Sequence, residues 1–197
     1  RDTSGAATRP ATPRPTWEYE QQWWNEGVSL VAGIDEVGRG PLAGPVVAAA
    51  VILPRPNAQN ESVLTWISEL RDSKVISERV RERLVAEIRV HALWGVGTVS
   101  PQVVDQINIL QATRLAMKRA VEALPTRPGA LIIDGREVVE VTSPQRAVVG
   151  GDGRSVSIAA ASILAKVTRD RLMCELDERF PGYGFAANKG YGTAGHL

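Results

Sequence analysis

Five short apolar runs, each bounded by glycine, proline or polar residues, recur along the chain between longer segments. Runs of about four to eight residues rich in Val, Ile and Ala are typical of buried β-strands. They predict strands at residues 29–35, 46–53, 93–99, 130–134 and 146–149. Pro54 and Pro56 follow the second run and cannot continue a ladder of backbone hydrogen bonds.

Segments between these runs carry apolar residues at intervals of three and four, the spacing of one face of an α-helix. Ser77 is a suitable N-cap for one such helix, and Ser100 followed by Pro101 starts another. The second helix is expected to carry one continuous apolar stripe ending at Pro125. That stripe comprises Val103, Ile107, Leu110, Met117, Val121 and Leu124, and further helices are predicted at 17–26 and 155–179.

The order of these elements predicts a single α/β domain. A strand, a helix and a strand in succession form a right-handed crossover, which makes the strand at 130–134 parallel to an earlier one. Residues 156–165 carry no charge, so the last long helix is expected to lie close on the sheet. Residues 1–15, rich in Pro, Thr and Ala, are predicted to be a disordered extension of a domain spanning 16–197.

Composition narrows the class of protein. The 197 residues are 44% hydrophobic and 23% charged, as in an ordinary globular domain. No apolar run reaches the roughly 18 residues that a membrane span needs, so no membrane partner is expected. A net charge of +1 does not by itself indicate nucleic-acid binding. The single cysteine, Cys174, is expected to be a buried hydrophobic residue in a reducing cytoplasm.

Two adjacent carboxylates at the end of the first strand are the main chemical signal. Asp35 and Glu36 follow the apolar residues 31–34 and precede a Gly-Arg-Gly turn at 38–40. Alternation along a strand sends neighbouring side chains to opposite faces. We therefore expect both acids to serve one site only if the strand stops between them, a break that the glycines would allow. The alternative is an ordinary solvated strand end.

A strand followed by a glycine-rich turn also begins many dinucleotide-binding sites. The spacing here is G-x-G-x-x-x-G, through Gly38, Gly40 and Gly44, and the next segment is another strand. Without a helix N-terminus at this point a pyrophosphate has no amide cluster to bind. The dinucleotide interpretation is therefore disfavoured.

Four acids stand where apolar structure stops: Asp35, Glu36, Asp134 and Asp152. Strand ends can converge on one crevice, where clustered carboxylates repel one another unless divalent cations neutralise them. An all-oxygen ligand set favours Mg²⁺ or Mn²⁺ over zinc. Two such ions, about 3.5–4 Å apart, would support phosphodiester hydrolysis. From spacing alone, Asp134 and Asp152 can equally be turn residues.

Several segments together resemble bacterial ribonuclease HII, the type 2 ribonuclease H family. They occur in the family's order from about residue 17 to the end. The segments are GIDEVGRGPLAGPV (33–46), DSK (72–74), DQINILQAT (105–113), IAAASILAKVTRDR (158–171) and KGYGT (189–193).

This resemblance implies a ribonuclease H-like fold, a five-stranded mixed sheet flanked by helices, with the four acids as metal-binding residues. It also implies a substrate. Such enzymes cut the RNA strand of RNA/DNA hybrids and incise duplex DNA 5′ of a single ribonucleotide, leaving 3′-hydroxyl and 5′-phosphate ends. The protein is then expected to act as a monomer in the cytoplasm.

The resemblance also assigns substrate contacts. Gly38 and Gly40 allow the backbone to approach the 2′-hydroxyl, the group that distinguishes a ribonucleotide. Tyr191 matches a family tyrosine that packs on the adjoining sugar. Phosphate-positioning residues are predicted to be Arg39, Lys74, Lys166 and Lys189. For Lys166 the alternative is a salt bridge to Asp170, which we expect to be structural rather than a fifth metal ligand.

Two departures from the family pattern stand out. Gly150 occupies a position two residues before Asp152 where family members commonly have Lys. The family also commonly continues past the KGYGT segment into a basic helical tail, which is absent from the sequence up to Leu197. Two rival interpretations stay open: another nuclease or polynucleotidyl transferase on the same fold, and a catalytically idle module that binds hybrids.

Overall fold

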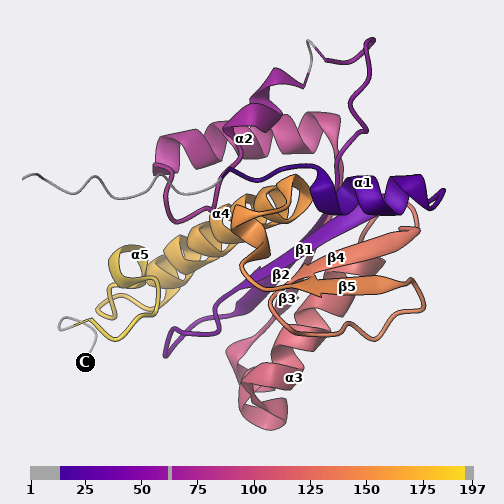
Figure 1. Ribbon diagram of the computed structural model, residues 1–197. Helices are drawn as coiled ribbons and strands as arrows, with labels where there is room; N and C mark the ends of the chain where they lie inside the picture. Colours follow the sequence, from indigo (N-terminus) through magenta and orange to yellow (C-terminus); the bar gives the residue numbers. More distant parts are fainter. Residues whose placement is uncertain (1–13, 62–63, 194–197) are drawn as a thin grey trace, which may run out of the picture.

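A five-stranded mixed sheet forms the centre of the molecule, with strand order β3-β2-β1-β4-β5 (Figure 1). In this computed structural model the described residues are 14–61 and 64–193. β1 pairs antiparallel with β2 and parallel with β4, which in turn is parallel to β5. The strands are β1 (Val31–Val37), β2 (Val46–Ile52), β3 (Leu93–Val99), β4 (Ala130–Asp134) and β5 (Gln145–Val148).

Helices cover both faces of this sheet (Figure 1). α4 (Val156–Arg179) lies on one face with α2 (Glu78–His91) packed outside it, and α3 (Pro101–Glu122) lies on the other. α1 (Glu18–Asn25) covers the β4–β5 side near the start of α4. The short helices are η1 (Thr65–Glu69), η2 (Gly151–Gly153) and α5 (Phe185–Asn188).

The strand and helix predictions are confirmed to within about two residues at each end. The parallel pairing predicted for residues 130–134 is also confirmed, with β1 as the partner. Of the extension predicted as disordered, residues 1–13 lie outside the described residues. None of the helices within 14–61 and 64–193 is long and apolar enough to cross a bilayer.

Alternation along the central strands divides the core in two. Ala48 and Ala50 of β2 face α3, whereas Ala49 and Val51 face α4. The α4 face admits a close helix because small residues line it: a Cβ at Gly33 would overlap the backbone of Ser157. The uncharged first half of α4 is buried in this contact, as its composition predicted.

Two expectations were wrong. The helix after Pro101 is not one continuous helix, since Asn108 has φ 67° and ψ 165° and breaks it. The Asn108 side chain accepts hydrogen bonds from the amides of Leu110 and Gln111, which caps the second half. The exposed Cys174 contradicts the prediction of a buried cysteine, because its position on α4 lies beyond the part that the sheet covers.

Gly97 on β3 lies directly under α3, so replacing it tests this packing. A Cβ there would overlap the carbonyl oxygen of Ala116 and stand 2.6 Å from the amide nitrogen of Ala120. Gly97→Ala should lower the free energy of unfolding, measured in urea, by about 1–3 kcal/mol, the usual cost of overpacking. Gly153→Ala is the control, because a Cβ at Gly153 meets nothing within 4 Å. Equal stabilities would show that α3 can move away at no cost.

Candidate active site

Asp35 and Asp134 lie side by side on the two central parallel strands. The register pairs Ile34 with Ile133, so the next residue on each strand is an acid. Both side chains are directed to the α4 face, since Ile34 and Ile133 belong to the core under α3. The side chain of Asp35 is buried, with 6% of its surface exposed. Asp35 and Asp134 are far apart in the sequence, and the parallel pairing of β1 with β4 brings them together.

The strand does not stop between Asp35 and Glu36, so that expectation was wrong. β1 continues to Val37, and Glu36 pairs with Ala48 of β2. The two acids therefore do occupy opposite faces of β1. They nevertheless interact with the same neighbour, because Asp134 raises the pKa of each. The negative charges of Asp35 and Glu36 therefore repel each other although they lie on opposite faces of β1.

Burial raises the pKa of Asp35 well above its ordinary value, and repulsion from Asp134 and then Glu36 raises it further. Hydrogen bonds from the Ser162 side chain and the Glu36 amide act in the opposite direction. Burial also raises the pKa of Glu36, partly offset by Arg39. A buried carboxyl with two acidic neighbours is the environment that a bound cation would relieve.

Asp152 stands in η2, just before α4. Burial, then Asp72 and then Asp134, raise the pKa of Asp152. The loop that carries it is tied to the sheet, since the Gly151 amide donates to Oδ1 of Asp134. This hydrogen bond joins Asp134 to the residue that precedes Asp152.

Lys74 lies beside these acids, although its side chain is 80% exposed. Its Nζ is 4.0 Å from Oδ2 of Asp152. Burial alone would lower the pKa of Lys74, but Asp72, Asp152, Asp35 and Asp134 together raise it. One ammonium group thus interacts with three of the four predicted acids, which indicates that they surround one region.

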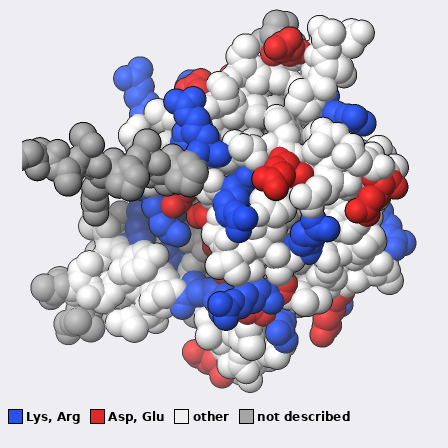
Figure 2. Space-filling model, in the orientation of Figure 1, with Lys and Arg blue, Asp and Glu red and all other residues white. Residues whose placement is uncertain are grey.

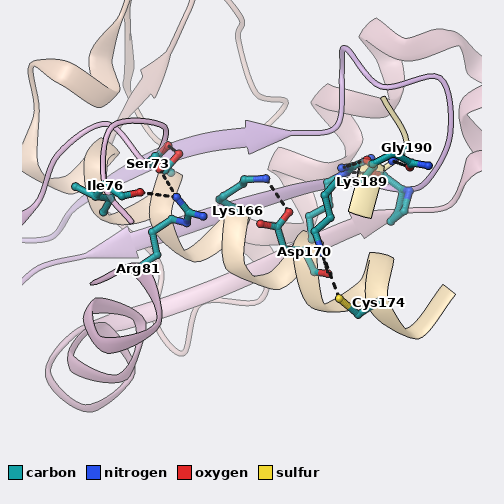
Figure 3. Close-up of polar contacts among 12 residues, drawn as sticks. Ser73, Ile76, Arg81, Lys166, Asp170, Cys174, Lys189 and Gly190 are labelled. Carbon is teal, nitrogen blue, oxygen red and sulfur yellow. Dashed lines mark hydrogen bonds and ion pairs between the residues drawn. The ribbon is translucent and has the colours of Figure 1, made fainter. Parts of the chain in front are cut away.

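The turn at residues 72–76 that presents Lys74 is held from two sides. Arg81 of α2 donates from Nη1 to the carbonyl oxygens of Ser73 and Ile76, at 2.9 and 2.7 Å (Figure 3). The Ser162 hydroxyl of α4 and the buried Ser73 hydroxyl share a hydrogen bond of 3.0 Å. None of Arg81, Ser73 and Ser162 was predicted from the sequence. Ser73 and Ser162 are 89 residues apart, and Arg81 bonds to backbone carbonyls, which no residue type marks.

Arg39 has two acidic partners. Its Nη1 is 3.2 Å from Oε1 of Glu36, and its Nη2 is 3.9 Å from Oε1 of Glu137. Glu137 also accepts from Nε of Arg114 on α3, at 3.1 Å. Glu137 was not predicted as a site residue, although its position three residues after Asp134 indicates that it lies near the site.

The two remaining lysines are engaged within the protein. Nζ of Lys166 is 2.7 Å from Oδ1 of Asp170, which is the salt bridge weighed as the alternative (Figure 3). Nζ of Lys189 lies 3.2 Å from Sγ of Cys174. Lys166 belongs to α4, whereas Lys189 follows α5 and reaches α4 at Cys174. Their phosphate contacts stay predictions.

Gly38 and Tyr191 belong to two loops that meet. Gly38 has φ +102°, and a Cβ there would lie 2.5 Å from the carbonyl oxygen of Pro45. A Cβ at Gly40 would lie 3.8 Å from Cε1 of Tyr191, so ring and turn are neighbours. The structure therefore brings the predicted sugar-contacting residues together.

The acid cluster offers carboxylate oxygens, as hard divalent cations require. Among the described residues, no three His, Cys, Asp or Glu side chains are gathered closely enough to hold one ion. Carboxylates that repel one another tend to stay apart, and a bound cation would offset that repulsion. The donor chemistry and the raised pKa of Asp35 fit a divalent cation.

Surface charge agrees with the low net charge. Figure 2 shows Lys and Arg side chains spread over this face, with acidic side chains between them. No single uninterrupted basic surface dominates the view. Any nucleic-acid contact would therefore depend on individually placed basic groups such as Lys74.

Removing the Asp35 charge should stabilise the protein in EDTA. A raised pKa means that the folded state binds the Asp35 proton more tightly than the unfolded chain does, so stability increases as pH falls through the folded pKa. Asp35→Asn should therefore melt higher than the wild type at pH 7, by about 2–4 °C per kcal/mol gained. The difference should shrink toward acidic pH. A variant that melts lower at pH 7 would contradict the inferred repulsion.

Comparison with solved structures gives the class of protein. The fold is similar to that of ribonuclease H2 from Pyrococcus horikoshii, with a TM-score of 0.69 and 26% identity over 84% of this chain and 82% of that one. Ribonuclease HII in a complex with PCNA from Archaeoglobus fulgidus is similar with a TM-score of 0.63 and 26% identity, covering 83% and 82%. Fold and acidic site define an α/β protein with the ribonuclease H-like fold.

Sequence comparison gives the family. Residues 32–197 match the Ribonuclease HII family. Ribonuclease HII of Desulfitobacterium hafniense is 53% identical over 90% of this chain, and that of Dehalococcoides mccartyi is 49% identical over 95%. The chain spans 66% of the length of the first relative and 87% of the second. The chain belongs to the ribonuclease HII family.

Proposed function

We propose that this protein is an endoribonuclease that depends on two Mg²⁺ or Mn²⁺ ions. Its substrates are RNA/DNA hybrids, in which it cuts the RNA strand, and duplex DNA containing single ribonucleotides, which it incises on the 5′ side. The products carry 3′-hydroxyl and 5′-phosphate ends. The protein acts as a monomer in the cytoplasm. Membership of the ribonuclease HII family supports this reaction class.

One observation carries the proposal: Asp35 and Asp134 adjoin on parallel strands, with Glu36 close enough to raise the pKa of Asp35 further. Asp152 completes the set through the loop tied to Asp134. When bound, two divalent ions would supply an activated water and stabilise the leaving 3′-oxygen. The four carboxylates would hold those ions.

Other residues would place the substrate. Lys74 lies at the edge of the acids and is largely exposed, so its ammonium group can bind a phosphate. Gly38 and Gly40 present backbone to the sugar without a side chain between them, which suits contact with a 2′-hydroxyl. Tyr191 adjoins Gly40 and would pack on the neighbouring sugar.

The pairing of Arg39 with Glu36 suggests how these roles connect. Nη1 of Arg39 bonds to Oε1 of Glu36. If Glu36 turns toward a cation, the Arg39 guanidinium becomes available to a phosphate oxygen. Glu137 would keep Arg39 near the site during that change.

Cleavage assays on three matched duplexes test this function. One duplex has a uniform RNA strand, one carries a single ribonucleotide and one is all DNA. We expect cutting of the first two in Mg²⁺ or Mn²⁺, no cutting in EDTA and none of the third. A protein that shifts the hybrid in a gel but leaves it uncut would be the idle binding module. Cutting of the all-DNA duplex would indicate a different nuclease.

A further inference from the structure

Arg169 is the largest fully buried side chain of the described residues, with 0% of its surface exposed. It extends from the middle of α4 and uses all three of its nitrogens. Nε donates to the carbonyl oxygen of Pro45 at 2.9 Å, Nη1 to that of Lys189 at 2.8 Å and Nη2 to that of Ala43 at 3.0 Å. A buried guanidinium is costly unless its donors are satisfied, and here backbone carbonyls satisfy them.

These three carbonyls come from two loops far apart in the chain. Ala43 and Pro45 end the loop that begins with the Gly-Arg-Gly turn, and Lys189 precedes Tyr191 by two residues. The loops also pair directly, since the amides of Leu42 and Ala43 donate to the Gly190 carbonyl at 2.8 and 3.3 Å. Figure 3 shows Lys189 and Gly190 beside the part of α4 that carries Asp170.

Arg169 contacts both ends of the first loop. An added Cβ at Gly38 would lie 2.8 Å from Arg169 Nε, and one at Gly44 would lie 3.0 Å from Nη2. The loop that would sense the sugar therefore closes around the guanidinium. Burial lowers the pKa of Arg169, partly offset by Tyr191 and Asp170. Asp170 also pairs with Lys166.

Only a planar guanidinium group, with its N–H donors in fixed directions, fits these three carbonyl oxygens. Arginine presents five N–H groups in fixed directions, whereas lysine presents one ammonium group at the end of a flexible stem. A lysine at 169 would keep the positive charge but leave at least one buried carbonyl unpaired. The geometry, and not the charge alone, is what the two loops require.

We propose that Arg169 is a positioning residue that sets substrate selectivity, by fixing the sugar-sensing loop 38–45 against the segment that carries Tyr191. The inference rests on the proposed function. Arg169 itself contacts no substrate. It aligns two loops that approach one sugar from separate elements, and a displacement of about 1 Å at such a contact can cost about 100-fold in rate.

Two variants at this position separate geometry from charge. Arg169→Met removes charge and donors, and Arg169→Lys keeps only the charge. Both should lower kcat/KM on the single-ribonucleotide duplex about 10-fold more than on the uniform hybrid, where many adjacent sugars offer alternative registers. Mn²⁺ affinity, measured by calorimetry, should stay within about 2-fold, because no acid of the site bonds to Arg169.

Two further variants serve as controls. Gly190→Ala places a Cβ against the Ala43 carbonyl and should reproduce the selectivity change with Arg169 intact. Met117→Ala removes a fully buried side chain from the other core, under α3, and should lower the melting temperature without changing the ratio of the two substrates. Hydrogen exchange of the Leu42 and Ala43 amides should accelerate in the Arg169 and Gly190 variants only.

Rescue of the substrate ratio by Arg169→Lys would overturn the proposal, since charge would then suffice. An unchanged ratio in Arg169→Met, or an equal change in Met117→Ala, would show that Arg169 only stabilises the fold. If the wild type cuts neither substrate, the proposed function is wrong, and so is the proposed role of Arg169 in substrate selectivity. Hydrogen exchange would in that case still report whether Arg169 joins the loops.

Discussion

Replacing Asp134 by Asn should abolish Mg²⁺-dependent cleavage while leaving the fold intact. The turn should survive, because the amide oxygen of Asn can accept the hydrogen bond that Asp134 takes from Gly151. What is lost is a negative charge between β1 and the η2 loop. Loss of groups that merely support metal ligands costs about 10–100-fold, so removal of a direct ligand should cost more than about 100-fold in kcat/KM.

The measurement is single-turnover cleavage of the duplex with one ribonucleotide, together with a thermal melt. Asp177→Asn is the matched control, because it makes the same chemical change in the C-terminal part of α4, outside the acid cluster. Activity retained by Asp134→Asn would remove Asp134 from the metal site. Activity lost equally by Asp177→Asn would point to net charge rather than a specific ligand.

Tyr191→Ala should damage selectivity more than stability. Tyr191 is 45% exposed, and its ring adjoins Gly40, so the ring lies at the surface beside the turn proposed to contact the sugar. Aromatic stacking in nucleic-acid complexes contributes about 1–3 kcal/mol, which corresponds to a loss of roughly 5- to 150-fold in incision at a single ribonucleotide. The melting temperature should change by only about 2 °C, as for an exposed substitution.

Tyr183→Ala provides the comparison for that variant. Tyr183 is 57% exposed and stacks on Phe185 with ring centroids 5.4 Å apart. Its removal should leave the ratio of incision to hybrid cleavage unchanged. If Tyr191→Ala lowers melting temperature and both activities in proportion, the ring packs within the protein and does not read the sugar.

Most of the fold could be predicted because its signals are local. Apolar runs of strand length, a capping Ser77, and Pro101 at a helix start depend on residues adjacent in the chain. The kink at Asn108 was missed because the apolar stripe continues through it, and only the backbone angles mark the break. Cys174 was misplaced because periodicity does not say how far along α4 the sheet extends.

The candidate site was predictable in its members and not in its arrangement. The sequence singles out Asp35, Glu36, Asp134 and Asp152 as acids at the ends of apolar structure. It could not show that Asp35 and Glu36 lie on opposite faces of an unbroken strand and still share Asp134 as a neighbour. That sharing depends on β1 pairing parallel with β4.

The amino-acid sequence by itself determined the order of strands and helices, the acids at strand ends and the resemblance to one family. Tertiary structure alone decided which acid adjoins which and that Arg169 joins two loops. Periodicity and capping act over a few residues, so they can be read along the chain. Strand register and the burial of a guanidinium depend on segments 99 to 126 residues apart, which only folding brings into contact.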